Sequence, residues 1–254
     1  MTRVLRFKNN FYFVKNNIDS GKFGHVYEVA NIHGIKAVKK TKNNLLINHN
    51  ELKYLKKCRG SNKIIHLIDY KVTEEYIYLL TKFYKNGDFF NYIEKNENNI
   101  EINEIKKIIS LLAEPIKELN EKKLVHLDIK PENYLINNFN KNIPNLILSD
   151  LGSVHKMPYK IESTRFNVGS KSYCAPEILE NKYHKNSDIW SLGMIVYILV
   201  IGEMPDTKNY SDLMKILEER RINENIYEML KYCLKENPYD RYTINDILNH
   251  KWKN

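Results

Sequence analysis

Cysteine, glycine and proline are all scarce in this sequence. Its 254 residues include only three cysteines, Cys58, Cys174 and Cys233, which lie far apart and form no Cys-x-x-Cys pair. An odd number of isolated cysteines argues against a disulfide framework and against a cysteine zinc site, and it favours a reducing compartment. Nine glycines and seven prolines exclude collagen-like sequence and Pro/Gly-rich low complexity.

Long hydrophobic runs are also absent. The longest run, residues 194–201, is too short to span a bilayer and predicts a buried helix. The basic N-terminal residues 1–8 contain no apolar core and no small-residue cleavage site, so we expect no signal peptide. The sequence therefore predicts a cytoplasmic, intracellular protein, located in the host cytoplasm or nucleus if its origin is viral or parasitic.

The composition is typical of a folded domain with a basic surface. Hydrophobic residues make up 43% of the chain and aromatic residues 11%, which excludes a disordered protein. The length suits one large domain or two small ones. The net charge of +9 permits a polyanionic partner, but a solvated lysine-rich surface explains it more simply. We therefore expect a monomer without a specific nucleic-acid partner or a membrane partner.

Hydrophobic periodicity divides the chain into a β-rich part and a helical part. Alternating apolar residues predict strands at 11–14, 25–30, 35–39, 64–70 and 76–81, with one helix among them at about 45–58. Helical spacing then predicts helices at 102–123, 187–202, 211–220, 225–234 and 243–249. Pro115 falls inside the first of these and predicts a lost hydrogen bond or a slight kink.

Two glycines and a lysine in the β-rich part suggest a phosphate site. Gly21 and Gly24 lie between two strand-like segments, where residues without a Cβ let backbone N–H groups approach phosphates. Lys39 follows on the next strand and could reach the same phosphates. Glu51 is the only acidic residue between Lys40 and Asp69, and it could pair with Lys39. From this segment alone, an ordinary surface glutamate is an equally good interpretation.

A second group of polar residues lies in a short stretch between apolar flanks. Residues 125–135 place Asp128, Lys130 and Asn133 in one turn. Residues 146–148 predict a buried strand, and Asp150 stands at its end. Asn133 and Asp150 offer hard oxygen ligands of the kind that Mg²⁺ prefers. Asp128 is left to orient a substrate hydroxyl.

Taken in order, these motifs resemble those of the eukaryotic protein kinases. The resemblance covers nearly the whole chain and continues through Gly169-Ser170, 173–177, 188–193 and Arg241. It implies an α+β, bilobal protein-kinase-like fold, with a small β-rich N-lobe, one main helix in that lobe and a larger helical C-lobe. It further implies a single domain over 1–254, with the N-lobe at about 1–81, a hinge at about 82–85 and the C-lobe at about 86–254.

The resemblance also implies a role for each candidate residue. The catalytic residues would be Asp128, Lys130 and Lys39, and the metal ligands Asn133 and Asp150. The residues expected to bind ATP are Gly21, Gly24, Val26, Ala37, Lys39, Glu51, Lys82, Tyr84, Asp88 and Leu135. Away from the nucleotide, Asp188 would support the catalytic loop and Glu177 would pair with Arg241.

Three residues depart from the family pattern. Asp19 replaces the first glycine of the phosphate loop, where a carboxylate repels phosphates unless it points outward. Leu127 replaces the arginine that receives the activation-loop phosphate, so we expect activity without that phosphorylation. Leu151 replaces a common phenylalanine, which is a mild change.

The pattern resembles serine/threonine-specific members, because Lys130 follows Asp128 and Ser170 follows Gly169. The sequence thus predicts a kinase that transfers the ATP γ-phosphate to Ser/Thr hydroxyls of protein substrates, with Mg²⁺. Asp88 and Glu132 suggest a preference for a basic residue upstream of the target. The main alternative is a pseudokinase that acts as a nucleotide-binding or scaffolding module. A small-molecule kinase and a nucleic-acid-binding protein are further alternatives.

Overall fold

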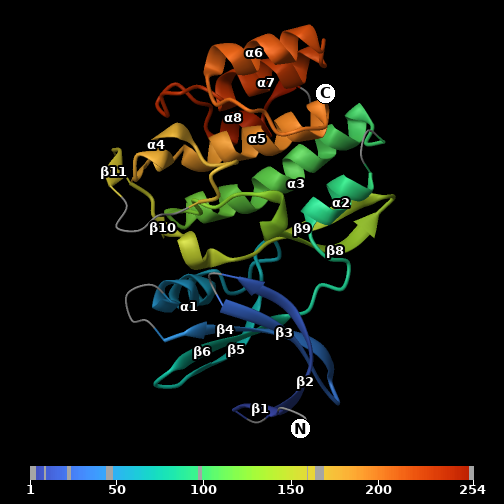
Figure 1. Ribbon diagram of the computed structural model, residues 1–254, viewed down its shortest axis with the longest axis vertical. Coiled ribbons are helices and arrows are strands. Elements are labelled where there is room, and N and C mark those ends of the chain that lie inside the picture. The colour runs from blue at the N-terminus through green and yellow to red at the C-terminus, as the bar shows by residue number, and fades with distance from the viewer. Residues whose placement is uncertain are drawn as a thin grey trace. The chain divides into compact units, whose positions relative to one another are not determined.

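The computed structural model of the protein describes residues 4–8, 10–21, 24–43, 48–96, 99–158, 160–163 and 169–251. The chain forms two compact units (Figure 1). The first contains residues 1–85 and 149–152, and the second contains residues 86–148 and 153–254. Each unit has its own set of secondary-structure elements.

The first unit is built on an antiparallel six-stranded sheet with the order β1-β2-β3-β4-β6-β5. The strands are β1 (Val4–Phe7), β2 (Asn10–Gly21), β3 (Gly24–Asn31), β4 (Gly34–Lys42), β5 (Leu67–Val72) and β6 (Tyr76–Lys82). The five predicted strands are present, although β5 begins at Leu67 rather than at residue 64. The additional strand β1 was not predicted. Its Phe7 packs with Tyr12, Val29 and Val38 in a buried apolar cluster.

One helix, α1 (Asn48–Lys57), accompanies the sheet in the first unit. It buries Leu52 and Leu55. The predicted start of this helix, at residue 45, lies outside the described residues. Its described part confirms the prediction.

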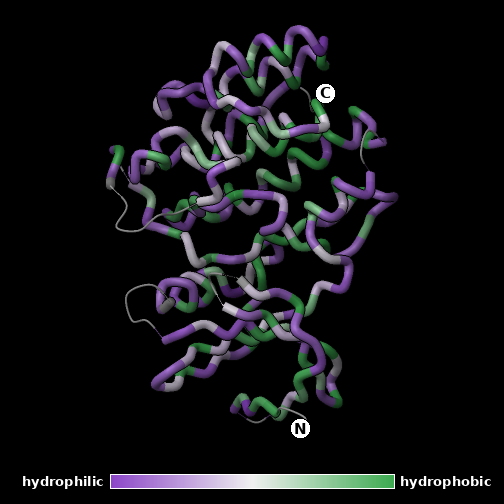
Figure 2. Tube along the Cα trace, viewed as in Figure 1, coloured by the Kyte–Doolittle hydropathy of each residue, from purple (hydrophilic) through white to green (hydrophobic). Residues whose placement is uncertain are grey.

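The second unit is mainly helical. Its helices are α2 (Phe89–Lys95), α3 (Ile102–Glu121), α4 (Pro176–Leu179), α5 (Ser187–Ile201), α6 (Tyr210–Glu219), α7 (Glu224–Cys233) and α8 (Ile244–Leu248). The five helices predicted in this part are confirmed to within two residues at each end. Helix α5 is mainly hydrophobic, whereas α3 alternates hydrophobic and hydrophilic residues (Figure 2), and α3 packs against both α5 and α8.

Short pairs of strands complete the second unit. They are β8 (Tyr134–Asn140) with β9 (Ile143–Leu148), β7 (Leu124–Val125) with β10 (His155–Lys156), and β11 (Glu162–Ser163) with β12 (Lys182–Tyr183). The strand predicted at 146–148 is confirmed as the end of β9, whereas β8, the pairs of two-residue strands and the short helices α2 and α4 were not predicted. Two-residue strands contain too few residues for a period-2 pattern to be visible.

Helix α3 continues through Pro115, which is buried. A proline inside a helix leaves a carbonyl one turn earlier without its usual donor. Nearby in the same turn, the hydroxyl of Tyr134 donates to the carbonyl of Leu112 at 2.9 Å. A side chain from β8 thus donates a hydrogen bond to the helix backbone close to the place where Pro115 cannot donate one.

A buried ion pair joins α4 to the segment before α8. Arg241 donates from Nη1 and Nη2 to the two carboxylate oxygens of Glu177, both at 2.7 Å. The exposed fractions of the two side chains are 0% and 6%. Ser187 donates to the same carboxylate at 2.7 Å. The predicted pairing of these two residues is confirmed.

In the part of the chain that the structure describes, no helix has both the length and the apolar character needed to cross a bilayer.

We predict that Arg241→Ala lowers the free energy of unfolding by about 3–5 kcal/mol, because it leaves the buried Glu177 carboxylate without its cation. Urea denaturation measures the loss. The matched control is Arg220→Ala, since the pair between Arg220 and Glu203 is 59% and 69% exposed. The control loss is expected to stay below about 1 kcal/mol. Equal losses for the two variants would refute a stabilising role for the buried pair.

Candidate active site

Lys39 lies between two carboxylates in the first unit. It is on β4, and its Nζ donates to Glu51 Oε1 of α1 at 2.9 Å and to Asp150 Oδ1 at 2.7 Å. Asp150 has a φ of 52°, a left-handed backbone conformation that is uncommon outside glycine. The structure thus confirms the predicted pairing of Lys39 with Glu51, and it adds Asp150, which is 111 residues away in the sequence.

The charges of this cluster influence one another. Burial by itself lowers the pKa of Lys39, but the Asp150 and Glu51 carboxylates outweigh it and hold the pKa above its usual value. Burial raises the pKa of Glu51, and Lys39 opposes this effect only in part. Lys39 therefore remains a cation at neutral pH, held in place by two acceptors.

The predicted phosphate loop joins β2 to β3. Gly21 ends β2 and is the cross-strand partner of Gly24, which begins β3. Gly24 has a φ of +124°, and a Cβ there would lie 2.3 Å from the carbonyl oxygen of Lys40. Only glycine fits this position. Asp19 is exposed, and its Oδ1 accepts a hydrogen bond from the amide of Ser20 at 2.7 Å.

The other candidate nucleotide residues of the first unit lie on β3, on β4 and just after β6. Val26 and Ala37 are half-buried on β3 and β4. Lys82 is exposed, with its ammonium 5.3 Å from the centre of the Tyr84 ring. Burial raises the pKa of Tyr84 to about 12, so its hydroxyl is neutral at physiological pH.

In the second unit, a hydrogen-bond network surrounds Asp128. The Ser170 hydroxyl donates to Asp128 Oδ1 at 2.9 Å and accepts from Lys130 Nζ at 2.8 Å. Asn133 Nδ2 donates to the carbonyl of Asp128 at 2.7 Å and to its Oδ2 at 3.2 Å. Lys130 Nζ is also 3.5 Å from Asp128 Oδ2. The three polar residues of the short predicted turn are therefore brought together around one carboxylate.

Ser170 is the member of this network that the sequence did not assign to the site. It is 42 residues from Asp128, and its hydroxyl bridges Asp128 and Lys130. The sequence contained a signal, since Ser170 directly follows Gly169. Gly169 has a φ of +81°, and a Cβ there would lie 2.8 Å from the carbonyl oxygen of Leu127.

Asp188 holds the backbone of the catalytic loop. Its two carboxylate oxygens accept from the amides of His126 and Leu127, at 2.7 and 2.8 Å. Asp188 is buried, and burial raises its pKa. Leu127 has a φ of 66° and a buried side chain. The predicted supporting role of Asp188 is confirmed.

The remaining candidates of the second unit are Asp88 and Leu135, which face each other in an isolated β-bridge. Leu135 is half-buried. Asp88 is the N-cap of α2, where its Oδ1 accepts from the amide of Asn91 and both carboxylate oxygens accept from Asn91 Nδ2. A cap role therefore accounts for this carboxylate within its own helix.

The candidates thus form two local clusters, one in each unit. The first unit brings Lys39 together with Glu51 and Asp150. The second unit brings Asp128 together with Lys130 and Asn133. Among the described residues, no group of three or more His, Cys, Asp or Glu side chains could hold a metal by itself. The proposed metal ligands Asn133 and Asp150 belong to different units.

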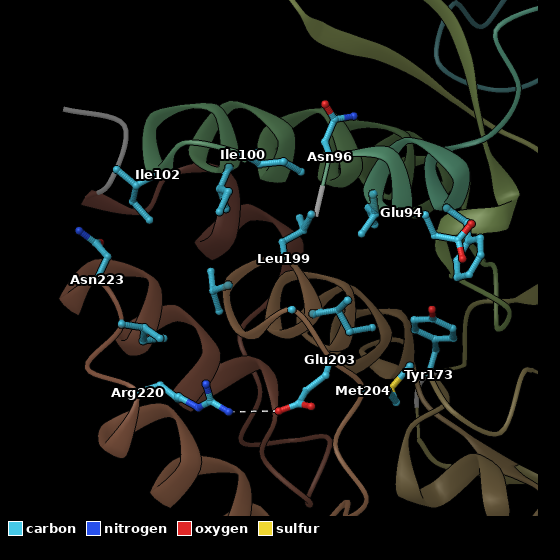
Figure 3. Close-up of a pocket in the computed structure, with 17 residues that line it drawn as sticks. Glu94, Asn96, Ile100, Ile102, Tyr173, Leu199, Glu203, Met204, Arg220 and Asn223 are labelled. Carbon is cyan, nitrogen blue, oxygen red and sulfur yellow. Dashed lines mark hydrogen bonds and ion pairs between the residues drawn. The ribbon is translucent and has the colours of Figure 1, made fainter. Parts of the chain in front are cut away.

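The second unit also contains a cavity of about 560 Å³ (Figure 3). Its walls come mainly from α2, α3 and the end of α5, and Glu203 forms an ion pair with Arg220 at its edge, at 3.2 Å. Of the residues that line the cavity, none is a predicted catalytic or nucleotide-binding residue. Tyr173, three residues after Ser170, is the lining residue nearest to the Asp128 network in the sequence.

We predict that Lys39→Met makes stability depend more steeply on pH. Without Lys39 the folded-state pKa of Glu51 rises further above its unfolded value, so the folded state binds protons more tightly and stability falls as pH increases. We expect urea denaturation to show a loss of about 1–3 kcal/mol at about pH 8 and a smaller loss at about pH 5.

The control for this prediction is the double variant Lys39→Met/Glu51→Gln, in which the buried carboxylate is absent. It should recover most of the loss at the higher pH. A loss that is the same at both pH values, or that persists in the double variant, would contradict the electrostatic explanation.

Comparison with known proteins shows which family the sequence matches. A family model described as the protein kinase domain matches residues 12–253. Calcium-dependent protein kinase 5 of Plasmodium berghei is 31% identical over 94% of this chain and 45% of its own length. Serine/threonine-protein kinase SIK2 of Gallus gallus is 31% identical over 95% of this chain and 32% of its own length.

A third relative, serine/threonine-protein kinase chk1 of Schizosaccharomyces pombe, is 27% identical over 96% of this chain and 54% of its own length. The chain thus spans about half, or less, of the length of the curated relatives it matches. The match itself runs through the sheet, the Lys39 cluster and the Asp128 network. The chain belongs to the protein kinase domain family.

Proposed function

We propose that this chain is an active serine/threonine protein kinase that transfers the γ-phosphoryl group of ATP to a Ser or Thr hydroxyl of a protein. The observation that carries the proposal is the network in which Asp128 binds both Ser170 and Asn133 within one unit. Members of the family use ATP and a divalent metal ion, and the relatives are named as kinases. A degraded site would be expected to lack one of these groups.

Asp128 is proposed to accept the proton of the substrate hydroxyl during transfer. Phosphoryl transfer needs little covalent chemistry from the protein, so catalysis depends on positioning and charge neutralisation. Ser170 and Asn133 fix the orientation of the Asp128 carboxylate. Lys130 is proposed to steady the γ-phosphoryl group, since its ammonium already lies beside the same carboxylate.

The nucleotide is proposed to bind to residues of both units. Gly21 and Gly24 approach the phosphates, and Lys39 binds the α- and β-phosphates while Glu51 holds its ammonium. Val26, Ala37 and Leu135 are proposed to enclose the adenine, whose edge bonds to the backbone of a hinge at 82–85 that includes Lys82 and Tyr84. In this scheme, the N-lobe is residues 1–81 and the C-lobe is residues 86–254.

Magnesium is the divalent ion that the donor chemistry supports. Asn133 and Asp150 would hold it, with hard oxygen atoms of the kind that this ion selects. Asn133 donates two hydrogen bonds to Asp128 from Nδ2, and an amide ligates a metal ion through its oxygen, so Oδ1 would be the ligand atom. The bound ion supplies neutralisation of the phosphate charge. Asp19 does not oppose this scheme, because its carboxylate is exposed and bonded to its neighbour's amide.

The substrate preference is proposed to depend on Glu132 more than on Asp88. Glu132 is exposed and lies in the short 3-10 helix Pro131–Asn133, four residues after Asp128. The Asp88 carboxylate already accepts three hydrogen bonds from Asn91. A basic residue upstream of the phosphorylated Ser or Thr would therefore meet Glu132 as its acidic partner. The three cysteines are buried and form no disulfide, which supports a reducing compartment such as the cytoplasm.

We predict that the purified chain transfers radiolabelled phosphate from Mg·ATP to a generic Ser/Thr substrate, and that Asp128→Asn lowers kcat by about 10²–10⁴-fold. The control variant Asp206→Asn changes an exposed carboxylate outside the site and should retain full activity. Transfer by Asp128→Asn at the wild-type rate would refute the assigned role. A wild-type chain that shifts its melting temperature with Mg·ATP but transfers nothing would instead be a pseudokinase.

We also predict that phosphatase treatment leaves the activity unchanged. Leu127 offers no positive charge to an activation-loop phosphate, and its buried apolar side chain cannot bind one. The measurement compares initial rates before and after treatment with a broad-specificity protein phosphatase, with phosphate content determined by mass spectrometry. A large loss of rate that accompanies loss of phosphate would show that the segment needs phosphorylation after all.

A further inference from the structure

Lys208 makes an unusual set of contacts for a lysine on a connecting loop. It lies between α5 and α6 and is half-buried. Its ammonium donates to the carbonyl of Lys171, to the carbonyl of Cys174 at 2.5 Å and to Cys174 Sγ at 3.6 Å. An ammonium has three N–H donors, so these three acceptors use all of them.

The acceptors of Lys208 all belong to one turn of the chain. In this turn, residues 170–174, the amides of Tyr173 and Cys174 donate to the carbonyl of Ser170 at 3.0 and 2.9 Å. Cys174 Sγ also donates to the carbonyl of Lys171 at 3.6 Å. Lys208 therefore binds the carbonyls of a turn whose own hydrogen bonds converge on Ser170.

The same turn carries the hydroxyl that orients Asp128. Ser170 bridges Asp128 and Lys130 at hydrogen-bond distances, as described above. On the N-terminal side of Ser170, Gly169 packs so closely on the carbonyl of Leu127 that a Cβ would not fit. On the C-terminal side, Lys208 binds the turn from another element through the carbonyls of Lys171 and Cys174. Ser170 is thus held from both sides.

Neutral acceptors surround the Lys208 charge. None of its three acceptors is a carboxylate. Burial lowers the pKa of Lys208, and the thiol of Cys174 and the more distant Glu177 oppose this effect only in part. Desolvation of an ammonium without an ion-pair partner costs stability. A general contribution to stability therefore does not explain the placement of this lysine, whereas the geometry of its acceptors does.

We propose that Lys208 is a positioning residue for phosphoryl transfer. It holds the turn 170–174 so that the Ser170 hydroxyl keeps its hydrogen bonds to both Asp128 and Lys130. The inference rests on the proposed function and deepens it. Lys208 donates to Lys171 and Cys174 and not to Asp128, so it acts on Asp128 through the turn and Ser170. Its removal should lower turnover without changing the affinity for ATP.

The test compares the variant Lys208→Met with Lys208→Arg. Lys208→Met retains an unbranched apolar side chain but has no donor, and we expect kcat for a peptide substrate to fall about 100-fold, as for a misplacement of about 1 Å at a reacting group. The KM for ATP should stay unchanged. Lys208→Arg keeps the charge and the donors, and it should recover a large part of the lost rate. Lys215→Met, on the exposed face of α6, is the matched control and should behave as wild type.

A double-mutant cycle separates positioning from general stability. In a Ser170→Ala background the bridge is already absent, so Lys208→Met should cost little further activity. A merely structural role would cost the same factor in both backgrounds, and that result would overturn the proposal. If Lys208→Met does not fold, Lys208→Gln, which keeps two N–H donors without the charge, takes its place in the cycle.

The proposed function and this inference fail in different ways. A wild-type chain without transfer activity overturns both. Full activity of Lys208→Met, in a preparation where Asp128→Asn is inactive, overturns only the role of Lys208. A parallel rise in KM for ATP and fall in kcat would likewise contradict positioning, because it would indicate damage to the whole domain. Faster hydrogen exchange of the Tyr173 and Cys174 amides in Lys208→Met supports it.

Discussion

The conformation of the catalytic loop depends on one buried carboxylate. Leu127 has a left-handed backbone, which for a residue with a branched side chain costs about 1–3 kcal/mol. The two oxygens of Asp188 accept from the amides of His126 and Leu127, and hydrogen bonds to a charged group contribute about 1.5–3 kcal/mol each. The two bonds thus offset the backbone strain. The carbonyl of Leu127 lies against Gly169, the residue before Ser170, so the geometry around Asp128 depends on a buried carboxylate outside the Asp128 network.

Buried charges elsewhere in the molecule also connect segments that are distant in the sequence. Lys39 joins β4, α1 and the segment at Asp150, and Arg241 joins the segment before α8 to Glu177 on α4. Such pairs gain little net stability over apolar packing, but losing one partner is costly. Their main physical effect is to penalise every arrangement in which the partners separate. Folding of each unit and the assembly of its polar cluster are therefore the same event.

The sequence predicts what depends on local pattern and misses what depends on turns. The long helices were predictable because α3 and α5 carry many apolar residues at helical or continuous spacing. Strand β1, helix α2 and the two-residue strands are too short for such a pattern. The pair of Lys39 and Glu51 was predictable because Glu51 is isolated among basic residues. Lys208 gave no signal in a chain with 40 lysines and arginines, and only the fold shows which one has carbonyls around it. The N-cap role of Asp88 was missed because the sequence also permits a substrate contact there.

Leu127 stands where the family pattern has an arginine, and this difference changes which contacts can fix the turn that carries Ser170. A buried leucine cannot draw a phosphate toward the catalytic loop, so no outside charge can fix the neighbouring turn through this position. The contacts that remain are internal. Gly169 fixes one end of the Ser170 turn by close packing, and Lys208 fixes the other end by binding its carbonyls. We therefore expect this turn, held at both ends by the folded chain, to adopt its conformation without covalent modification. The conformation of this turn should therefore depend on the stability of the second unit and not on a modifying enzyme.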